Sequence, residues 1–197
     1  MAYTSCAATF AANIAKDCAT PLTGGYTGRG VLIDLADVTA ITRDGSNPRI
    51  ITAITMKAGS YCCVIDNSFG PQPLTGSQTQ SNTDDGMMKF RKTVVLNIPR
   101  RGADASKDIV EPSYQSPLGY LAVLEKKDRV GDGSYEIVGY GQGLTVNPDG
   151  IMRNENENDG DIVVTMSCDE QFFEVTFFDT NYATTKAAFE TLMASAF

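Results

Sequence analysis

The chain has 197 residues, 42% of them hydrophobic, and a formal net charge of −8 at pH 7. This length supports one hydrophobic core without disulfides or a structural metal, and the negative charge argues against a sequence-specific nucleic-acid binder, which needs a basic surface. The chain has no histidine, which excludes Ser-His-Asp and Cys-His catalysis and His-ligated metals. Carboxylate, lysine, tyrosine or cysteine chemistry stays open, but no pattern places two carboxyl groups in a cleft. We therefore expect a single domain, 1–197, that is not an enzyme and has no catalytic residues.

The N-terminal segment, about residues 1–20, is expected to be an arm or a short helix. Cys6, Phe10 and Ile14 follow one another at intervals of four residues, which places them on one helical face. No basic residue precedes this apolar stretch, so it does not resemble a secretory leader. No apolar run reaches the ~18–20 residues that cross a bilayer. We expect a protein made in a cytoplasm, without a membrane partner.

The chain has five cysteines, an odd number without regular spacing, which does not suggest a disulfide framework. Cys62 and Cys63 are adjacent in an expected strand, so their side chains point to opposite faces and cannot easily share an ion. We expect reduced thiols that pack as small hydrophobic side chains. Neither a metal site nor a cofactor is predicted.

Three strands are expected in the first 65 residues. Apolar Val31–Leu35 follows the glycine-rich stretch Gly24–Gly30, which we interpret as a bend because it lacks the Lys-Ser/Thr pair of a phosphate-binding loop. Arg49–Lys57 and Ser60–Ile65 are rich in β-branched residues. The turn Ala58-Gly59 lies between them and predicts two strands joined tightly.

Residues 66–88 are predicted to form a long loop. The sequence from Asp66 to Gly86, DNSFGPQPLTGSQTQSNTDDG, contains two prolines, three glycines and almost no hydrophobic side chains. Loops longer than ~12–15 residues are uncommon in compact domains and are usually functional or disordered. Phe69 and Leu74 have little reason to stand in an exposed linker, which favours a role in binding.

The middle of the chain predicts a strand, a short helix and a hairpin. Lys89–Ile98 is the strand, with alternate apolar residues on one face. Residues 103–111 are the helix, which is expected to end before Pro112. Tyr120–Lys127 and Ser134–Tyr140 are expected to pair as a hairpin around a glycine-rich turn.

Three further elements are expected near the C-terminus. Ile162–Cys168 alternates apolar and polar residues like a half-buried strand. Phe172–Phe178 is predicted to be a strand with aromatic side chains on both faces, and residues 183–194 a helix. The glycines between Gly139 and Gly143 lack the spacing and the following helix of a dinucleotide fingerprint, so we interpret them as a bend or bulge.

These elements amount to about eight strands with short flanking helices, without regular βαβ alternation. The predicted fold class is therefore mainly β (α+β), an antiparallel β-sandwich or barrel. No internal repeat and no change of composition marks a second domain.

The acidic run from Glu155 to Asp161 partly matches the calcium-binding loop of an EF-hand. Carboxylates stand at loop positions 1, 3 and 5 and a glycine at position 6, but position 12 is Met166 and no helix enters the run. We interpret the run as a solvated turn before a strand. A β-sandwich module that binds calcium or another ligand through its loops stays an alternative.

Charge is distributed unevenly along the chain. Residues 153–197 hold nine acidic and two basic residues, whereas a basic stretch lies between Lys89 and Arg101. Two patches of opposite sign on one molecule allow head-to-tail contacts, which close a ring or extend a filament.

Three stretches resemble the tail tube (major tail) proteins of tailed bacteriophages. They are the hairpin YLAVLEKKDRVGDGSYEIVGYGQGL, the link NPDGIMRNENENDG, and the strand pair DIVVTMSCDEQFFEVTFF before a terminal helix. The resemblance is one of pattern over most of the chain, without a sharp signature motif. It implies a tail-tube-like β-sandwich or barrel whose copies form rings, usually hexameric, that stack into a hollow tube for DNA.

Under this resemblance the chain is expected to be a structural virion protein, assembled in the host bacterial cytoplasm. Its partners would be copies of itself, other phage tail proteins, and double-stranded DNA in transit without sequence specificity. Ten loop, charged and aromatic residues are the expected subunit interface: Phe69, Leu74, Lys89, Arg91, Arg100, Arg101, Glu155, Glu157, Phe172 and Phe178. Another phage structural protein, such as a neck, tail-terminator or capsid-decoration protein, is the alternative within this class.

Overall fold

The computed structural model describes residues 25–66, 74–82, 88–98, 106–128, 131–152 and 162–195. The strands in these ranges are β1 (Tyr26–Asp34), β2 (Val38–Arg43), β3 (Ile50–Met56), β4 (Cys63–Asp66), β5 (Leu74–Asn82), β6 (Met88–Ile98), β7 (Tyr120–Lys126), β8 (Tyr135–Val138), β9 (Thr145–Met152), β10 (Ile162–Glu170) and β11 (Val175–Phe177). The main helix is α3 (Tyr182–Ala194), and a π-helical turn at Ser106–Val110 leads into the single-turn α2 (Glu111–Ser113). Short 3-10 turns lie at Leu35–Asp37 and Gly131–Ser134.

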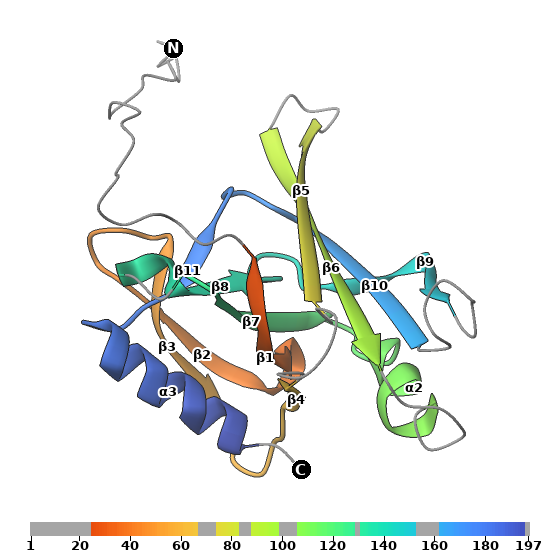
Figure 1. The fold of residues 1–197 in the computed structure, drawn as a ribbon, viewed down its shortest axis with the longest axis horizontal. Coiled ribbons are helices and arrows are strands. Elements are labelled where there is room, and N and C mark those ends of the chain that lie inside the picture. The colour runs from red at the N-terminus through yellow and green to blue at the C-terminus, as the bar shows by residue number, and fades with distance from the viewer. Residues whose placement is uncertain are drawn as a thin grey trace.

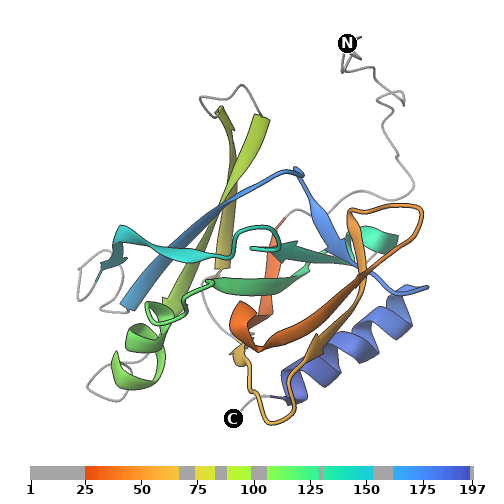
Figure 2. The same cartoon turned by 180° about the vertical axis from the view of Figure 1, so that it is seen from behind.

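The strands form two sheets (Figure 1). The larger has the order β2-β3-β11-β8-β7-β1-β4, in which only β3 and β11 run parallel to each other. The smaller has the order β5-β6-β10-β9 and is antiparallel throughout. The hairpin of β5 and β6 reaches beyond the other described elements in both views (Figures 1 and 2).

The seven-stranded sheet is the middle one of three layers (Figure 2). One face packs on the four-stranded sheet through a core that includes Leu124 and Met166. The other face packs on α3 through a second core that includes Leu121 and Phe189. Because successive side chains of a strand point to opposite faces, β7 contributes side chains to both cores. Its sequence is therefore almost continuously apolar.

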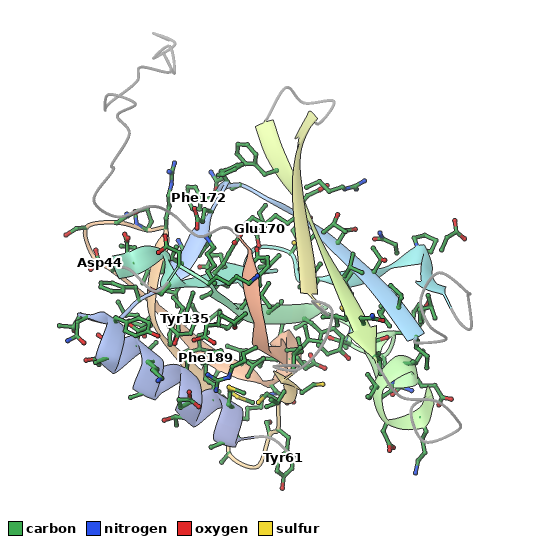
Figure 3. All side chains as sticks on the ribbon, in the orientation of Figure 1. Asp44, Tyr61, Tyr135, Glu170, Phe172 and Phe189 are labelled. Carbon is green, nitrogen blue, oxygen red and sulfur yellow. The ribbon has the colours of Figure 1, made fainter. Side chains whose placement is uncertain are left out.

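Helix α3 covers the face of the seven-stranded sheet that is remote from the four-stranded sheet. It begins at Asn181, whose Oδ1 accepts a hydrogen bond from the Thr184 N–H at 3.0 Å. Such a cap stabilises a helix by about 1 kcal/mol. The buried Phe189 ring lies 4.8 Å from the ring of Tyr135 on β8 (Figure 3).

The mainly β fold class is confirmed, and most expected strands lie close to their predicted bounds. The predicted hairpin is β7–β8, in which Val123 is paired with Ile137. The predicted alternation in β10 is also confirmed, since Ile162, Val164 and Met166 are all buried. The predicted C-terminal helix is α3.

The long loop predicted over residues 66–88 is wrong for residues 74–82, which form β5. This strand pairs with β6 from Leu74 opposite Leu96 to Asn82 opposite Met88. The polar composition of β5 gave no strand signal in the sequence. Whether a segment forms a strand depends more on packing against neighbouring strands than on its own residues. The other residues of the predicted loop between Asp66 and Met88 lie outside the described ranges, as does the predicted N-terminal arm.

The sheets are antiparallel as predicted, except for the parallel contact of β3 with β11, and their strand order does not follow the order along the chain. β3 and β4 follow each other across the turn at 58–59, but β4 pairs with β1, and β3 pairs with β2 and with β11. Strand β2 was not expected. Parallel partners such as β3 and β11 are joined by long crossovers, which local sequence patterns do not show.

Three element bounds also differ from the predictions. The strand predicted over Phe172–Phe178 is only Val175–Phe177, because residues 171–173 form a bend. The predicted link after Val146 continues as β9 to Met152. The short helix was predicted to end before Pro112, but α2 includes Pro112 in its first turn. Proline is tolerated there because the N–H groups of a first turn have no partner within the helix.

Candidate functional site

Half of the predicted interface residues lie in the described ranges: Leu74, Lys89, Arg91, Phe172 and Phe178. The other five, and the acidic run from 155 to 161, lie outside them: Phe69, Arg100, Arg101, Glu155 and Glu157. The contact between a basic and an acidic patch therefore stays a prediction. Leu74 is the first residue of β5.

Lys89 and Arg91 lie on β6, out of phase with the buried Lys92 and Val94. Strand alternation therefore places them on the face of the four-stranded sheet that points away from the core. The Arg91 side chain is 58% exposed, and its Nε lies 3.1 Å from Oδ1 of Asp169 on β10. An exposed ion pair of this kind contributes about 0–1 kcal/mol to folding stability. Because so little stability depends on it, Arg91 can exchange this partner for a group on another molecule.

The sequence predicted that Phe172 and Phe178 share one face of a single strand, but both lie outside β11. Phe172 lies in the bend before β11, and the Arg49 guanidinium lies 5.3 Å from its ring centre (Figure 3). Phe178 follows β11 and is partly buried, with its N–H donated to the Ile51 carbonyl at 2.9 Å. Within residues 172–178 the exposed aromatic is Phe173, 55% exposed, whose ring meets that of Phe90 edge-on with 5.5 Å between the ring centres.

The edges of the two sheets differ in how they are protected against pairing with another chain. β5 is an edge strand of nine residues without a charged residue or a proline. It pairs with β6 in nine consecutive steps without a register shift, and no other strand within the described ranges pairs with its outer side. A long and regular edge with unpaired backbone groups is a template for a further strand.

The opposite edge of the same sheet, β9, is interrupted. It contains Pro148 and Asp149, and its register with β10 shifts between Val164 and Met166. Gly150 sits in this bulge, where a Cβ atom would lie 2.5 Å from the Thr165 carbonyl oxygen. Proline, charge and bulges are the devices that block edge pairing in natural sheets.

The two edges of the seven-stranded sheet are protected as well. β2 has two register shifts against β3, one near each end, and finishes at Arg43. β4 has only four residues. Among the four edges within the described ranges, β5 is therefore the long and regular one.

A second feature of the fold is a buried cluster of charged side chains at the end of the sandwich. Lys92 on β6, Glu136 on β8 and Glu170 on β10 are only 1%, 3% and 3% exposed. Lys92 Nζ lies 3.4 Å from Glu136 Oε1 and 3.1 Å from Glu170 Oε2, so it joins the two sheets. Figure 3 shows Glu170 within the body of the molecule.

Partners from three further elements complete the cluster. The Tyr26 hydroxyl of β1 donates to Glu136 Oε2 at 2.8 Å, and Lys126 Nζ of β7 lies 3.4 Å from the same oxygen. Lys126 also contacts Glu174 in the connection between β10 and β11. The other oxygen of Glu170, Oε1, accepts the N–H groups of residues 139 and 140 at 2.6 and 3.0 Å.

Burial shifts the proton affinities in this cluster. It raises the pKa of Glu170, although the Lys92 ammonium acts in the opposite direction. Burial and the Glu170 charge raise the pKa of the Cys168 thiol to about 12. Burial and the Glu136 charge raise the pKa of Tyr26, so both Tyr26 and Cys168 stay neutral at physiological pH.

This cluster was not predicted from the sequence, although the strand patterns contain a sign of it. Lys92 shares the alternation of Val94 and Leu96, and Glu170 shares that of Cys168, so both stand in the buried phase of their strands. Charged residues at such positions are almost never fully buried unless they are paired. Lys92 and Glu170 are nearly inaccessible to solvent, so a substrate could not reach their charged groups in this conformation. We therefore interpret the cluster as a contact that joins the two sheets.

No group of metal-ligating side chains occurs within the described ranges. In the same ranges, none of the helices has the length and apolar character needed to span a membrane. Comparison of the chain with protein-family models, curated proteins and solved structures found no match. The function proposed below rests on the chain's own residues and fold.

Proposed function

We propose that the chain is a structural subunit that assembles with copies of itself into stacked rings, as in the tail tube of a bacteriophage. The observation that carries the proposal is the unprotected edge of β5. The resemblance of the sequence to tail tube proteins supplies the kind of assembly, and the mainly β fold is compatible with it.

The β5 edge supports assembly because it offers a complete row of backbone donors and acceptors on its outer side. Addition of a strand to such an edge gains affinity from main-chain hydrogen bonds and needs few specific side chains. This agrees with the sequence of β5, LTGSQTQSN, in which polar and small residues predominate. The strand is long enough for several such bonds in register with β6.

Symmetry decides which assembly the edge can build. Two β5 strands that pair with each other around a two-fold axis close into a dimer and stop. A ring requires β5 to contact a different surface of the next copy, and repetition of that contact closes the ring. The adjoining ends of β5 and β6, which extend past the body in Figure 1, are then available for contact with an adjacent ring.

The test uses single prolines at neighbouring positions of β5. Successive N–H groups of a strand point to opposite sides, so one of Gln78→Pro and Thr79→Pro removes a bond to β6 and the other removes an outward donor. We expect one variant to lower the melting temperature and the other to fold normally but to assemble poorly in sedimentation velocity. Normal assembly of both variants, or a wild-type protein that stops at a two-fold dimer, would contradict the proposal.

A further inference from the structure

The buried cluster between the sheets carries more negative than positive charge among the described residues. Glu136, Glu170 and Glu174 face two ammonium groups, those of Lys92 and Lys126. The neutral side chains of Tyr26 and Cys168 complete the surroundings. Lys126 and Glu174 are the more exposed members and pair with each other, whereas the nearly inaccessible part holds two carboxylates, Glu136 and Glu170, and one ammonium group, Lys92. An excess carboxylate charge in such a place is costly.

The contacts of the three carboxylates show where one proton is best accommodated. Glu136 contacts two ammonium groups and accepts a hydrogen bond from the Tyr26 hydroxyl, so a carboxylate charge is well accommodated there. The Glu174 side chain is 37% exposed, so water stabilises its charge. Glu170 is buried, and within the described residues its Oε2 makes no hydrogen bond and contacts Lys92 as an ion pair at 3.1 Å.

The two oxygens of Glu170 have different surroundings. Oε1 accepts two backbone N–H groups at the start of the turn after β8, and this acceptor role is compatible with either protonation state. Oε2 faces Lys92 from β6, with Glu136 of β8 beyond it, whereas the Cys168 thiol lies 3.8 Å from Oε1. A proton on Oε2 removes the excess charge and leaves Lys92 paired with Glu136.

We propose that Glu170 Oε2 is a proton-binding site of the folded protein, which takes up one proton from solvent under mildly acidic conditions and so neutralises the buried cluster. The site does not depend on assembly into rings. It makes the junction between the two sheets sensitive to pH through one side chain, because Lys92 exchanges two carboxylate partners for one when the proton binds.

The direction of the pH effect follows from the raised pKa of Glu170. In the unfolded chain a glutamate has a pKa of about 4.3. The folded state binds the proton more tightly, so this group's stabilising contribution is complete below that value and is lost as the pH rises through the folded pKa. Most carboxylates in ion pairs act in the opposite direction.

Glu170→Gln is the matched variant, because the amide is neutral at every pH and keeps an oxygen for the two N–H groups. Thermal unfolding should be followed from pH 4 to pH 8. We expect the melting temperature of the wild type to fall relative to that of Glu170→Gln as the pH rises, in a single step. Glu190→Gln makes the same chemical change on α3, where Glu190 forms a partly exposed pair with Arg29 of β1, and controls for the loss of a carboxylate.

Carbon-13 NMR of the glutamate carboxyl groups in the wild type reads the proton directly and does not depend on whether the variant folds. We expect the Glu170 carboxyl resonance to titrate at a higher pH than that of a model glutamate, with each unit of difference equal to a tenfold tighter proton affinity. A Glu170 midpoint at or below the model value would overturn the proposal. So would a proton that binds to Glu136 instead, or a melting-temperature difference that does not change with pH.

Discussion

The two sheets of the molecule differ in how their faces and edges are covered. The seven-stranded sheet is covered on one face by α3 and on the other by the four-stranded sheet, and its edges are short or bulged. The four-stranded sheet is covered on one face and keeps β5 as a regular edge. Natural sheets widely protect their edges, so the regular and uncharged edge of β5 supports the proposal that another copy of the chain covers it.

If this contrast is correct, changes in the seven-stranded sheet should act on folding, and changes at β5 should act on assembly. The predictions below separate the two regions on that basis.

The largest effect is expected from Phe189→Ala in the core between α3 and the seven-stranded sheet. Phe189 is fully buried against Tyr135 and Leu192, and removal of a buried phenylalanine ring costs about 3–5 kcal/mol of folding stability. Chemical denaturation followed by circular dichroism measures this loss. The folded fraction of the variant should still assemble, because the β5 edge is unchanged. A variant that keeps its stability but no longer assembles would contradict the assignment of folding to the seven-stranded sheet and of assembly to β5.

The second effect compares lysines at the two edges of the four-stranded sheet. Thr79→Lys on β5 introduces the kind of charge that blocks edge pairing, and we expect it to raise the concentration needed for assembly at least tenfold, about 1.4 kcal/mol. Thr145→Lys on the interrupted edge β9 is the matched control, because Thr145 is already exposed. Analytical ultracentrifugation over a concentration series distinguishes them. Equal effects of the two lysines would show that β5 has no special role.

The fold was predictable from the sequence where strands alternate clearly or run apolar, as in β7 and β10. It was not predictable at β5, because a polar strand is recognised by its partner β6 and not by its own residues. The same reason applies to the parallel contact of β3 with β11, which joins distant segments. Of the candidate site, the sequence indicated Leu74 and the basic residues of β6, but not that an edge strand begins at Leu74.

A smaller effect is expected from Asn181→Ala at the start of α3. The Asn181 side chain caps the helix through the Thr184 N–H, and loss of such a cap costs about 1 kcal/mol. Thermal unfolding measures this change. Asn181→Asp keeps the capping oxygen and should retain most of the stability; if both variants lose it equally, the cap is not the cause.

The smallest effect on folding is expected from Arg91→Ala. Its ion pair with Asp169 is largely exposed, so its loss should change the free energy of unfolding by less than about 1 kcal/mol. Because Arg91 lies on the open face of the sheet beside β5, assembly should respond more than folding. Sedimentation at low and high salt tests this, and a variant that loses stability but assembles normally would place Arg91 in the folding core instead.

Negative-stain electron microscopy of the concentrated wild-type protein is the most direct test of the proposed assembly. We expect rings, and tubes of stacked rings, that become rarer when β5 carries Thr79→Lys and persist with Thr145→Lys. Single particles of monomer size at the highest concentration, or closed two-fold dimers, would contradict the proposal that this chain is a tube subunit.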